Sequence, residues 1–367
     1  FIRLNEGKNE EEKNCSLLNL IKKSDSDSIF TAYHSDFLTI SGCPIVFWAS
    51  NNIRLSFRTN KPISEYIITR EGLTTGNNDI FLRAWHEISQ NAVGYNIIDD
   101  ISAQKSNKKW FPYVKGGGCR RWYGNFEYFV NWINDGIELK AFKDEKSGRI
   151  RSHNYNGIYA FKAGFTWSGI SSNDFAVRNV PIGFMFDAKG PMGFVRDSVQ
   201  IELIESFLNS KVASMILQML APTLDFKLTH VLALPLKVIN SDALLKRTRT
   251  SIYFTKSDWD SYETSWDFTT LPLLSPEYRR DTLAATYAAL RAHWRDMTME
   301  MQRLEEENNR IFIEAYGLQD ELTPDVLLKE ITLTCNPHYR YGGDKTEEEL
   351  EALLLADTMK EFISYAE

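Results

Sequence analysis

The chain has 367 residues, of which 43% are hydrophobic and 25% are charged. These proportions are typical of a globular protein, and the length is enough for two or three domains. No apolar run is long enough to span a membrane, and the four cysteines are too scattered for a disulfide framework or a Cys-rich zinc site. We therefore expect a cytoplasmic protein with no membrane partner and no bound metal.

The charge is distributed unevenly along the chain. Residues 281–367 carry 19 acidic and 8 basic residues, a net charge of −11, whereas residues 1–280 carry 30 acidic and 34 basic residues, a net charge of +4. Basic surfaces attract polyanions such as nucleic acids. The division predicts that only the first part of the chain meets a polyanion.

The first 240 residues predict a polar segment followed by a region of mixed structure. Residues 1–30 are polar and indicate a linker or mobile segment, with a short helix near residues 17–22. Gly, Asn and Asp residues then separate short apolar runs that are typical of strands. These runs lie at residues 45–48, 66–69, 128–132 and 182–186.

Residues 198–220 show the clearest helical periodicity of this region. Ser198 is a suitable N-cap, and Pro222 ends the pattern. A strand is expected at residues 226–232. Residues 241–275 are rich in Ser, Thr and Asp but also hold several aromatic residues, which predicts an ordered connector between two domains.

A long helix is expected to begin near Pro276, with Ser275 as its cap, and to end at Gly317. Its apolar positions alternate by four and three residues, a heptad stripe about 45 Å long at ~1.5 Å per residue. Such a stripe needs a partner helix, and a bundle within this protein is favoured over a coiled-coil dimer. The stripe consists of Leu283, Tyr287, Leu290, Trp294, Met297, Met301, Leu304, Asn308, Ile311 and Ala315.

Two shorter helices are expected after the long one. Thr323 and Pro324 predict the start of the first. Thr346 and Glu349 have the spacing of a capping box, which predicts the start of the second.

Residues 105–125 combine positive charge with aromatic rings and glycines. Six basic residues and five aromatic residues interleave around Gly116, Gly117 and Gly118, and no acidic residue lies between Asp100 and Glu127. Cations attract phosphates, and rings and guanidinium groups stack on sugars and bases. The stretch therefore indicates nucleic-acid binding. The alternative is a solvated basic hairpin whose aromatic residues face the core.

Several distinctive short runs occur in this stretch and beyond it. They are WFPY (110–113), KGGG (115–118), RWYGN (121–125), VNWINDG (130–136), SGCPIVFW (41–48), GLTTGNND (72–79), GFTWS (164–168), FLNSK (207–211), DWDSYETSWDF (258–268) and LEEENNRIF (304–312). These runs resemble the PglX family, the adenine-specific DNA methyltransferases of BREX anti-phage systems. They follow the order of the family, cover most of the chain, and resemble the region that follows the methyltransferase domain.

The resemblance implies a parent protein that transfers a methyl group from S-adenosylmethionine to adenine N6 in a short non-palindromic site. This chain would select the site, hold no cofactor of its own, and be inactive alone. The implied partners are double-stranded DNA and the methyltransferase domain of the parent chain. Other BREX proteins or a phage DNA-mimic inhibitor are further partners that the resemblance suggests.

The motifs of catalysis itself are not convincing in this sequence. The run NPHY (336–339) is close to the Asn/Asp-Pro-Pro-aromatic loop that holds a flipped adenine, but His338 replaces the second proline. Asp135, Glu138 and Lys140 are similar to the end of a magnesium-dependent nuclease motif, yet no separate upstream acid completes it. We expect residues 134–136 to form a turn instead.

The predicted DNA contacts fall into two groups. Long cations on short spacing are suited to phosphates, and small polar side chains with an arginine fork are suited to base edges. The predicted phosphate contacts are Lys108, Lys109, Lys115, Arg120 and Arg121. The predicted base contacts are Thr75, Asn78, Ser171, Ser172, Asn173 and Arg178.

Together these observations predict an α+β fold in which a mixed-sheet target-recognition domain precedes an all-helical C-terminal domain. The predicted boundaries are a linker at residues 1–30, the recognition domain at 31–240, the connector at 241–275 and the helical domain at 276–367. The predicted function is sequence-specific DNA recognition within an adenine methyltransferase. The alternatives are a protein-interaction scaffold of a defence complex and a metal-dependent nuclease.

Overall fold

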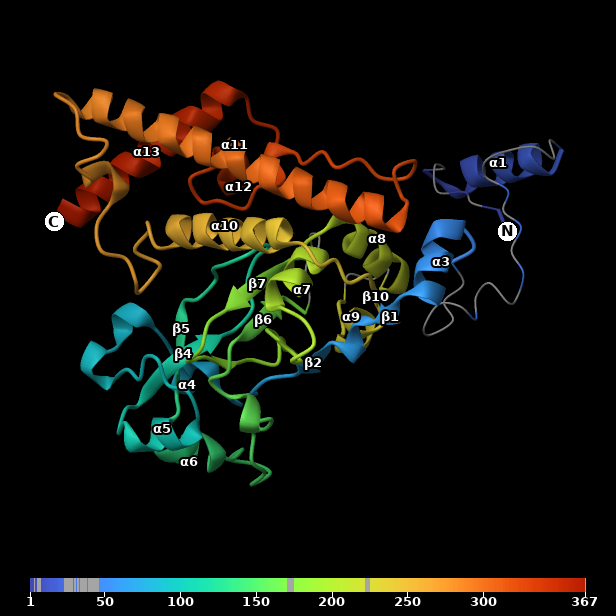
Figure 1. Ribbon diagram of the computed structural model, residues 1–367. Helices are drawn as coiled ribbons and strands as arrows, with labels where there is room; N and C mark the ends of the chain where they lie inside the picture. Colours follow the sequence, from blue (N-terminus) through green and yellow to red (C-terminus); the bar gives the residue numbers. More distant parts are fainter. Residues whose placement is uncertain are drawn as a thin grey trace.

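A computed structural model describes residues 46–169, 175–221 and 225–366, together with residues 8–22 and positions 1, 2, 4, 29, 31, 33 and 38. It confirms the α+β class (Figure 1). Two small sheets and the helices around them form the first part, and the long helix α11 (Leu283–Tyr316) runs along one side of it. None of the described helices is long and apolar enough to cross a membrane.

The first sheet is antiparallel throughout, in the order β2-β9-β6-β7. Its members are β2 (Ile67–Arg70), β9 (Met192–Val195), β6 (Gly164–Trp167) and β7 (Val177–Val180). One side packs against α3 (Asn51–Thr59), α7 (Ile201–Leu208), α8 (Lys211–Leu220) and α9 (Leu228–Leu232) in a shared apolar core. The last turns of α11 add Phe312, Ile313 and Tyr316 to this core.

The second sheet is mixed, in the order β3-β5-β4-β8. Its strands are β3 (Leu82–Ala84), β5 (Tyr128–Asn131), β4 (Trp110–Val114) and β8 (Met185–Phe186), and β8 alone pairs in parallel. The short helices α4 (Asn78–Phe81), α5 (Asp100–Lys105) and α6 (Ile133–Lys140) lie around it. A further short pairing joins β1 (Lys61–Pro62) to β10 (Pro235–Leu236).

The helical part packs beside the sheets. In Figure 1, α10 (Asp242–Trp259) lies between α11 and the sheets. The remaining helices are α12 (Pro337–Tyr341) and α13 (Glu347–Ala366), with α1 (Glu10–Lys22) near the N-terminus. A third core joins Leu290, Trp294 and Met301 of α11 to Leu354 of α13. The predicted partner of α11 within the protein is thereby confirmed.

Several predicted elements agree with the structure. The runs at 66–69, 128–132 and 182–186 contain strands, and the turn at residues 134–136 is present as three residues with positive φ. Gly317 ends α11 with φ 69°, a conformation that glycine adopts without strain. Thr346 and Glu349 make both bonds of the predicted capping box.

Other predicted elements are wrong. The expected helix at 198–220 is two helices, because Ser210 caps α8 by accepting a hydrogen bond from the Ala213 N–H at 3.2 Å. Residues 226–232 contain α9 in place of a strand, and residues 46–48 form no strand, residue 45 lying outside the described residues. The long helix begins after Thr282 and not near Pro276, and no helix starts at Thr323.

The connector prediction missed α10. Ser241 caps this helix by accepting a hydrogen bond from the Leu244 N–H at 3.3 Å. Its buried face is mostly polar, so a search for apolar periodicity does not find it. That face carries Leu244, Thr248, Ser251, Thr255 and Asp258 at alternating spacings of four and three. The hydroxyls of Thr248, Ser251 and Thr255 bond back to carbonyls of their own helix, which satisfies them inside the protein.

Candidate nucleic-acid interface

The three predicted phosphate-binding lysines lie at the two ends of β4 and are partly exposed. Lys108 donates to the Asn91 carbonyl at 2.5 Å, and Lys109 lies 3.8 Å from Glu138. Lys115, about 20 Å further along at ~3.3 Å per strand residue, has its ammonium 4.7 Å from the centre of the Tyr128 ring. These lysines therefore do not form one continuous strip with the arginines that follow them.

Arg120 is buried, which contradicts its prediction as a phosphate contact. Its guanidinium lies 3.3 Å from Asp258, whose side chain is fully buried, and donates to the Thr334 hydroxyl at 2.7 Å. The rings of Trp259 and Tyr339 lie on it at 5.0 and 5.8 Å. The charge of Arg120 is thus balanced inside the protein by the C-terminal end of α10.

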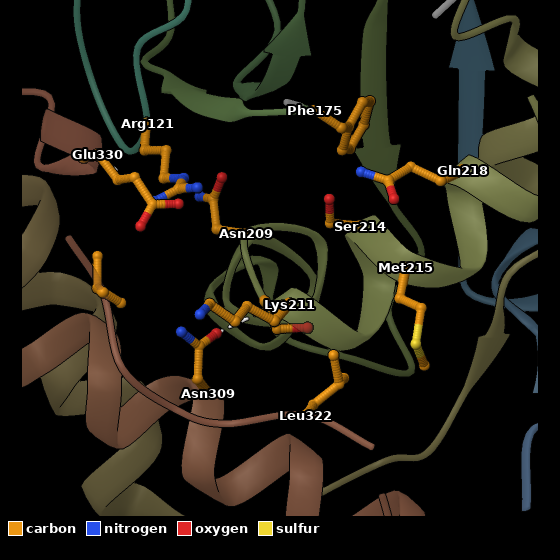
Figure 2. A pocket seen from close by; sticks show the side chains of 12 residues that line it. Arg121, Phe175, Asn209, Lys211, Ser214, Met215, Gln218, Asn309, Leu322 and Glu330 are labelled. Atoms are coloured by element: carbon orange, nitrogen blue, oxygen red, sulfur yellow. Dashed lines mark hydrogen bonds between the residues drawn. The ribbon is translucent and has the colours of Figure 1, made fainter. Parts of the chain in front are cut away.

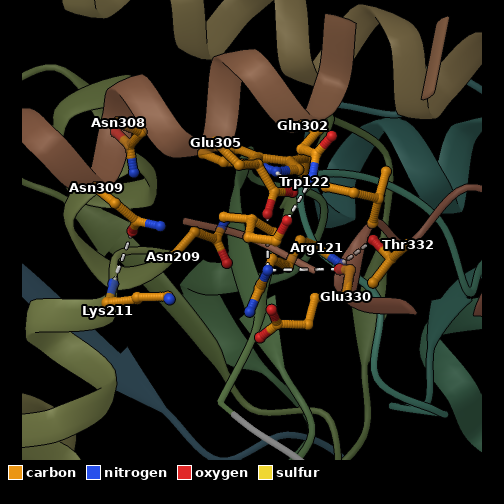
Figure 3. A network of polar contacts seen from close by, with 12 residues as sticks. Arg121, Trp122, Asn209, Lys211, Gln302, Glu305, Asn308, Asn309, Glu330 and Thr332 are labelled. Atoms are coloured by element: carbon orange, nitrogen blue, oxygen red, sulfur yellow. Dashed lines mark hydrogen bonds and ion pairs between the residues drawn. The ribbon is translucent and has the colours of Figure 1, made fainter. Parts of the chain in front are cut away.

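Arg121 is also turned inward, so its predicted phosphate contact is wrong in this structure. Its guanidinium forms a 2.7 Å ion pair with Glu305 on α11, and its backbone N–H donates to the Thr332 hydroxyl (Figure 3). The indole N–H of Trp122 donates to the other oxygen of Glu305 at 2.9 Å. Burial raises the pKa of Glu305, and the charge of Arg121, 2.7 Å away, opposes that rise.

The backbone around Arg120 and Arg121 explains why their side chains turn toward the helical part. Trp122 forms a parallel bridge with Arg178, and its N–H donates to the Val177 carbonyl at 2.8 Å. The segment 120–122 therefore extends the first sheet at β7, and its side chains meet the helical part. We call residues 119–122 and their partners Asp258, Glu305, Thr332, Thr334 and Tyr339 the clasp. Of the clasp residues, the sequence prediction included Arg120 and Arg121 and assigned their charges to DNA phosphates.

Arg178 is 1% exposed and cannot reach a base edge in this structure. One of its nitrogens lies 3.4 Å from the Arg120 carbonyl, and two others have no hydrogen-bond partner among the described residues. Burial lowers the pKa of Arg178 to about 10. The prediction of base readout by this residue is therefore wrong, because its fork is enclosed behind the clasp.

Of the other predicted base contacts, one is buried, one is exposed and three lie outside the described residues. Thr75 is buried and donates its hydroxyl to the Asn78 Oδ1 at 2.7 Å, so it supports the loop and does not face solvent. Asn78 is exposed in the first turn of α4. Ser171, Ser172 and Asn173 lie outside the described residues.

The run FLNSK (207–211) has a structural explanation. Asn209 bonds the Val177 N–H and the Val177 carbonyl at 2.9 and 3.1 Å, acting as a strand partner for β7. The Lys211 N–H donates to Asn309 at 2.9 Å, and the Ser206 hydroxyl donates to Asn308 at 2.5 Å. The motif thus joins the first sheet to α11.

A cavity of about 240 Å³ opens beside this motif, between α8, α11 and residues 322–330 (Figure 2). Arg121, Asn209 and Lys211 line it together with Phe175 and Met215. The hydrogen bonds just described engage Arg121 and Asn209, and the Lys211 ammonium bonds the Asp325 carbonyl. The polar groups of Arg121, Asn209 and Lys211 that line the cavity are therefore already hydrogen-bonded within the protein.

The described residues do not fit S-adenosylmethionine. The turn at Gly116–Gly118 leads into the clasp and not into a helix, and a second cavity, of about 490 Å³, is lined by the ion-paired Lys256 and Asp260 and by no glycine. Asn336 is 1% exposed, caps α12 and donates to two carbonyls, so the NPHY run is a helix start and not an adenine-binding loop.

The nuclease constellation is not assembled either. Lys140 pairs with Asp135 at 2.7 Å, whereas Glu138 accepts a hydrogen bond from Asn131 at 2.6 Å. The two carboxylates therefore serve different partners. Within the described ranges, no cluster of three or more His, Cys, Asp or Glu side chains could hold a metal ion.

One exposed basic segment, residues 142–151, is not among the predicted DNA contacts. Residues 142–151 form a short two-stranded hairpin, with Lys143 bridged to Ile150 and the Arg151 N–H donating to the Phe142 carbonyl at 3.0 Å. Lys143, Lys146, Arg149 and Arg151 are exposed on it. We call residues 142–151 the basic hairpin. Its signal in the sequence is the run KDEKSGR, where a turn-forming Ser-Gly follows mixed charges.

Comparison with known proteins identifies two similar adenine-specific methyltransferases. The chain is 38% identical over 337 residues to the adenine-specific methyltransferase PglX of Lacticaseibacillus casei (strain Zhang), a match that covers 91% of this chain. The resemblance to PglX is confirmed. The chain is also 33% identical over 361 residues, 98% of its length, to the adenine-specific methyltransferase BrxX of Escherichia coli O9:H4 (strain HS). It spans only 28% of the length of each relative.

Among solved structures, the chain is similar to the type IIL restriction-modification enzyme MmeI in complex with DNA. The TM-score is 0.37 at 12% identity, over 82% of this chain and 36% of that one. No protein-family model matches the chain.

Proposed function

We propose that this chain is the DNA-recognition part of a PglX-like, adenine-specific DNA methyltransferase of BREX defence. The observation that supports it is identity of 38% and 33% to two adenine-specific methyltransferases over nearly the whole chain. The parent would use S-adenosylmethionine, and its methyltransferase domain would be the partner of this chain. DNA is the proposed ligand, and another defence protein or a phage DNA mimic would compete for the same surface.

We assign site selection to this chain and methyl transfer to the methyltransferase domain of the parent protein, because of the motifs that this chain contains. Among the described residues neither the glycine-rich turn nor the NPHY run fits a cofactor or a flipped adenine, as shown above. Site selection needs only a surface that binds backbone and bases. We therefore expect the chain alone to transfer no methyl group. Incubation with radiolabelled S-adenosylmethionine and duplex DNA tests this, and label incorporated into adenine would contradict it.

The remaining phosphate candidates are the lysines outside the clasp. Lys108, Lys109 and Lys115 are partly exposed, and Asn78 is exposed in the first turn of α4 as a candidate base contact. Their existing partners are a carbonyl, one carboxylate at 3.8 Å and an aromatic ring. Such weak, solvated contacts exchange readily for phosphate, unlike the buried ion pairs of Arg120 and Arg121.

Fluorescence anisotropy with a labelled duplex tests the proposal. We expect affinity to fall steeply with salt, since each phosphate contact adds about 0.9 to the slope of log K against log salt. Replacing Lys108, Lys109 and Lys115 by Ala should weaken binding to all duplexes alike and flatten that slope by up to about 3. Replacing Lys329 and Lys345, two cations of the acidic helical part, by Ala is the control and should leave the slope unchanged.

A scaffold is the second candidate function, supported by the acidic helical part. Residues 281–367 carry a net charge of −11, and α13 exposes Leu353, Leu355 and Ile363. Acidic surfaces repel DNA and suit protein partners. If the chain shows no salt-dependent affinity for DNA, the recognition proposal fails and the scaffold becomes the better account.

A further inference from the structure

The basic hairpin, residues 142–151, presents free arginines at the surface. Arg149 and Arg151 are exposed, and neither forms an ion pair among the described residues. The guanidinium of Arg151 lies 5.9 Å from the centre of the Phe142 ring. This contrasts with Arg120 and Arg121, whose charges are balanced inside the protein. An exposed, unpaired guanidinium keeps its five donors for a ligand.

The hairpin is held in one shape before any ligand arrives. The Asp144 carboxylate accepts hydrogen bonds from the Ser147 N–H at 2.8 Å, the Ser147 hydroxyl at 2.9 Å and the Lys146 N–H at 3.2 Å. The bonds from Ser147 lower the pKa of Asp144. Gly148 completes the turn with φ 66°. The Asp144 carboxylate is therefore engaged by the turn, and among the described residues it forms no ion pair with Arg149 or Arg151, although the charge of Arg151 also lowers its pKa slightly.

The base of the hairpin is tied to the protein. His153 and Thr74 exchange two backbone hydrogen bonds, at 2.9 and 3.1 Å, and the Ser152 hydroxyl donates to the buried Leu139 carbonyl at 2.7 Å. Gly76 lies so close that a Cβ there would be 2.6 Å from the Arg151 Cβ. The base of the hairpin and the loop of residues 72–78 are therefore packed against each other.

This geometry suits one groove of DNA. The major groove of B-DNA is about 12 Å wide and admits a two-stranded ribbon, and its base edges bind arginine forks at guanine. Arg149 and Arg151 are two residues apart on one strand, so they project from the same face of the ribbon. Lys143 pairs with Ile150 and therefore lies on the opposite face, away from the groove floor.

We propose that the basic hairpin enters the major groove of the target DNA and that Arg149 and Arg151 read guanine bases there. The inference rests on the proposed DNA-recognition function. It deepens that function because it moves base readout from the buried Arg178 to an exposed ribbon. Lys146, at the exposed turn of the hairpin, serves as its phosphate contact.

A charge-preserving variant tests the reading role. The 367-residue chain is used to enrich sequences from a randomised duplex library, and the preference at each position is compared between wild type, R149K/R151K and R149A/R151A. Lysine keeps the charge but lacks the bidentate fork. We expect R149K/R151K to keep its affinity for scrambled DNA and to lose preference at one or two guanine positions, by about 5- to 150-fold each. R149A/R151A should lose the same preferences and also bind scrambled DNA more weakly.

The control is R58A/R279A, which removes two exposed arginines outside the hairpin and should leave the selected motif unchanged. An unchanged motif in R149K/R151K would overturn the inference, whether or not R149A/R151A weakens all binding. In that case a wild-type motif would still support the proposed function. A wild-type chain that enriches no motif would overturn both. Thermal melting checks that each variant is folded.

Discussion

Arg121 and Glu305 show how one buried contact fixes the role of a residue. The pair is 2.7 Å long, and the Glu305 side chain is 4% exposed. Removing one member of such a pair leaves the other charge buried without a partner, which destabilises proteins by about 3–5 kcal/mol. The sequence shows two adjacent arginines beside aromatic residues, and that pattern is the same whether the partner is a phosphate or a carboxylate 184 residues away.

The first prediction concerns this pair. We expect Glu305→Ala to lower the free energy of unfolding by about 3–5 kcal/mol, because Arg121 and the Trp122 indole lose their acceptor. Urea denaturation followed by fluorescence measures the change. Glu300→Ala on the same helix is the matched control: Glu300 pairs with Arg303 at the surface, and such pairs contribute about 0–1 kcal/mol. Equal effects of the two substitutions would show that the clasp is not a stabilising contact.

A second prediction concerns Glu205, which is 1% exposed. One oxygen accepts from Asn179 at 2.8 Å, and the other has no partner among the described residues. Burial raises the pKa of Glu205 well above its ordinary value of 4.5. The folded chain therefore keeps the proton at pH values where the unfolded chain releases it. Stability is fully present below pH 4.5 and falls as pH rises toward the folded pKa.

Glu205→Gln removes this titration while keeping the shape of the protonated acid. We expect the variant to gain stability relative to wild type as pH rises above about 4.5, by up to ~1.4 kcal/mol for each pH unit until the folded group ionises. Urea denaturation at several pH values from 5 to 8 measures the difference. A constant difference across this range would mean that Glu205 is ionised in the folded chain.

At the scale of elements, α11 belongs to two cores. Leu290, Trp294 and Met301 pack in the helical part, whereas Phe312 and Tyr316 pack beneath the first sheet. The heptad stripe predicts the residues that pack in the helical part but not those that pack against the first sheet, because the buried positions shift to Phe312 and Ile313 after Asn308. At the other end of the helix, Leu283 belongs to the stripe but is 47% exposed. The helix changes partner after Asn308, and a periodic pattern does not reveal such a change.

The third prediction uses two methionines of this helix. Met301 is 1% exposed and Met299 is 57% exposed. Replacing a buried methionine by alanine removes packing and leaves a cavity, so we expect Met301→Ala to reduce the free energy of unfolding by about 2–5 kcal/mol. Met299→Ala, the control, should change it by less than about 0.5 kcal/mol. Similar effects at both positions would contradict the orientation of α11.

The sequence predicted elements best where apolar residues carry the pattern. The strands at 66–69 and 128–132 and the end of α11 at Gly317 follow directly from local chemistry. It failed at α10, because the buried face of that helix is built of Thr, Ser and Asp. It also failed at residues 208–211, where Asn209 leaves the helix to bond β7. The first failure comes from buried hydroxyls that are satisfied within their own helix, and the second comes from an amide whose partner, Val177, is distant in the chain.

The candidate site was harder to predict than the fold. A sequence does not distinguish an exposed arginine from a buried one, and Arg120, Arg121 and Arg178 were therefore predicted to contact DNA. Burial depends on the helical part, which supplies Asp258 and Glu305. The basic hairpin was missed because Asp144 and Glu145 mask its charge, although Asp144 is engaged by the turn itself. The roles of Lys108, Lys109, Lys115 and Asn78 stay predictions.

At the scale of the whole molecule, the clasp and α11 join the sheets to the helices. Asp258 accepts from the Thr334 and Cys335 N–H groups at 2.7 and 2.9 Å and pairs with Arg120, so one carboxylate connects three segments. The Tyr339 hydroxyl adds a bond to the Cys119 carbonyl at 2.7 Å. Parts that share a buried network and a continuous helix unfold together. We therefore expect the sheets and the helical part to form one cooperative unit.

The last prediction tests that unit by calorimetry. The wild-type chain should show a single main unfolding transition, and Asp258→Asn should lower its midpoint by roughly 5 °C or more, because Arg120 then lies buried beside a neutral group. Amide exchange should quicken in β7 as well as in α10, since both depend on the clasp. Asp267→Asn is the control, because its pairing with Lys256 is exposed and it lies outside the clasp. Two resolved transitions in the wild type, or faster exchange confined to α10 in the variant, would show that the sheets and the helical part are independent domains.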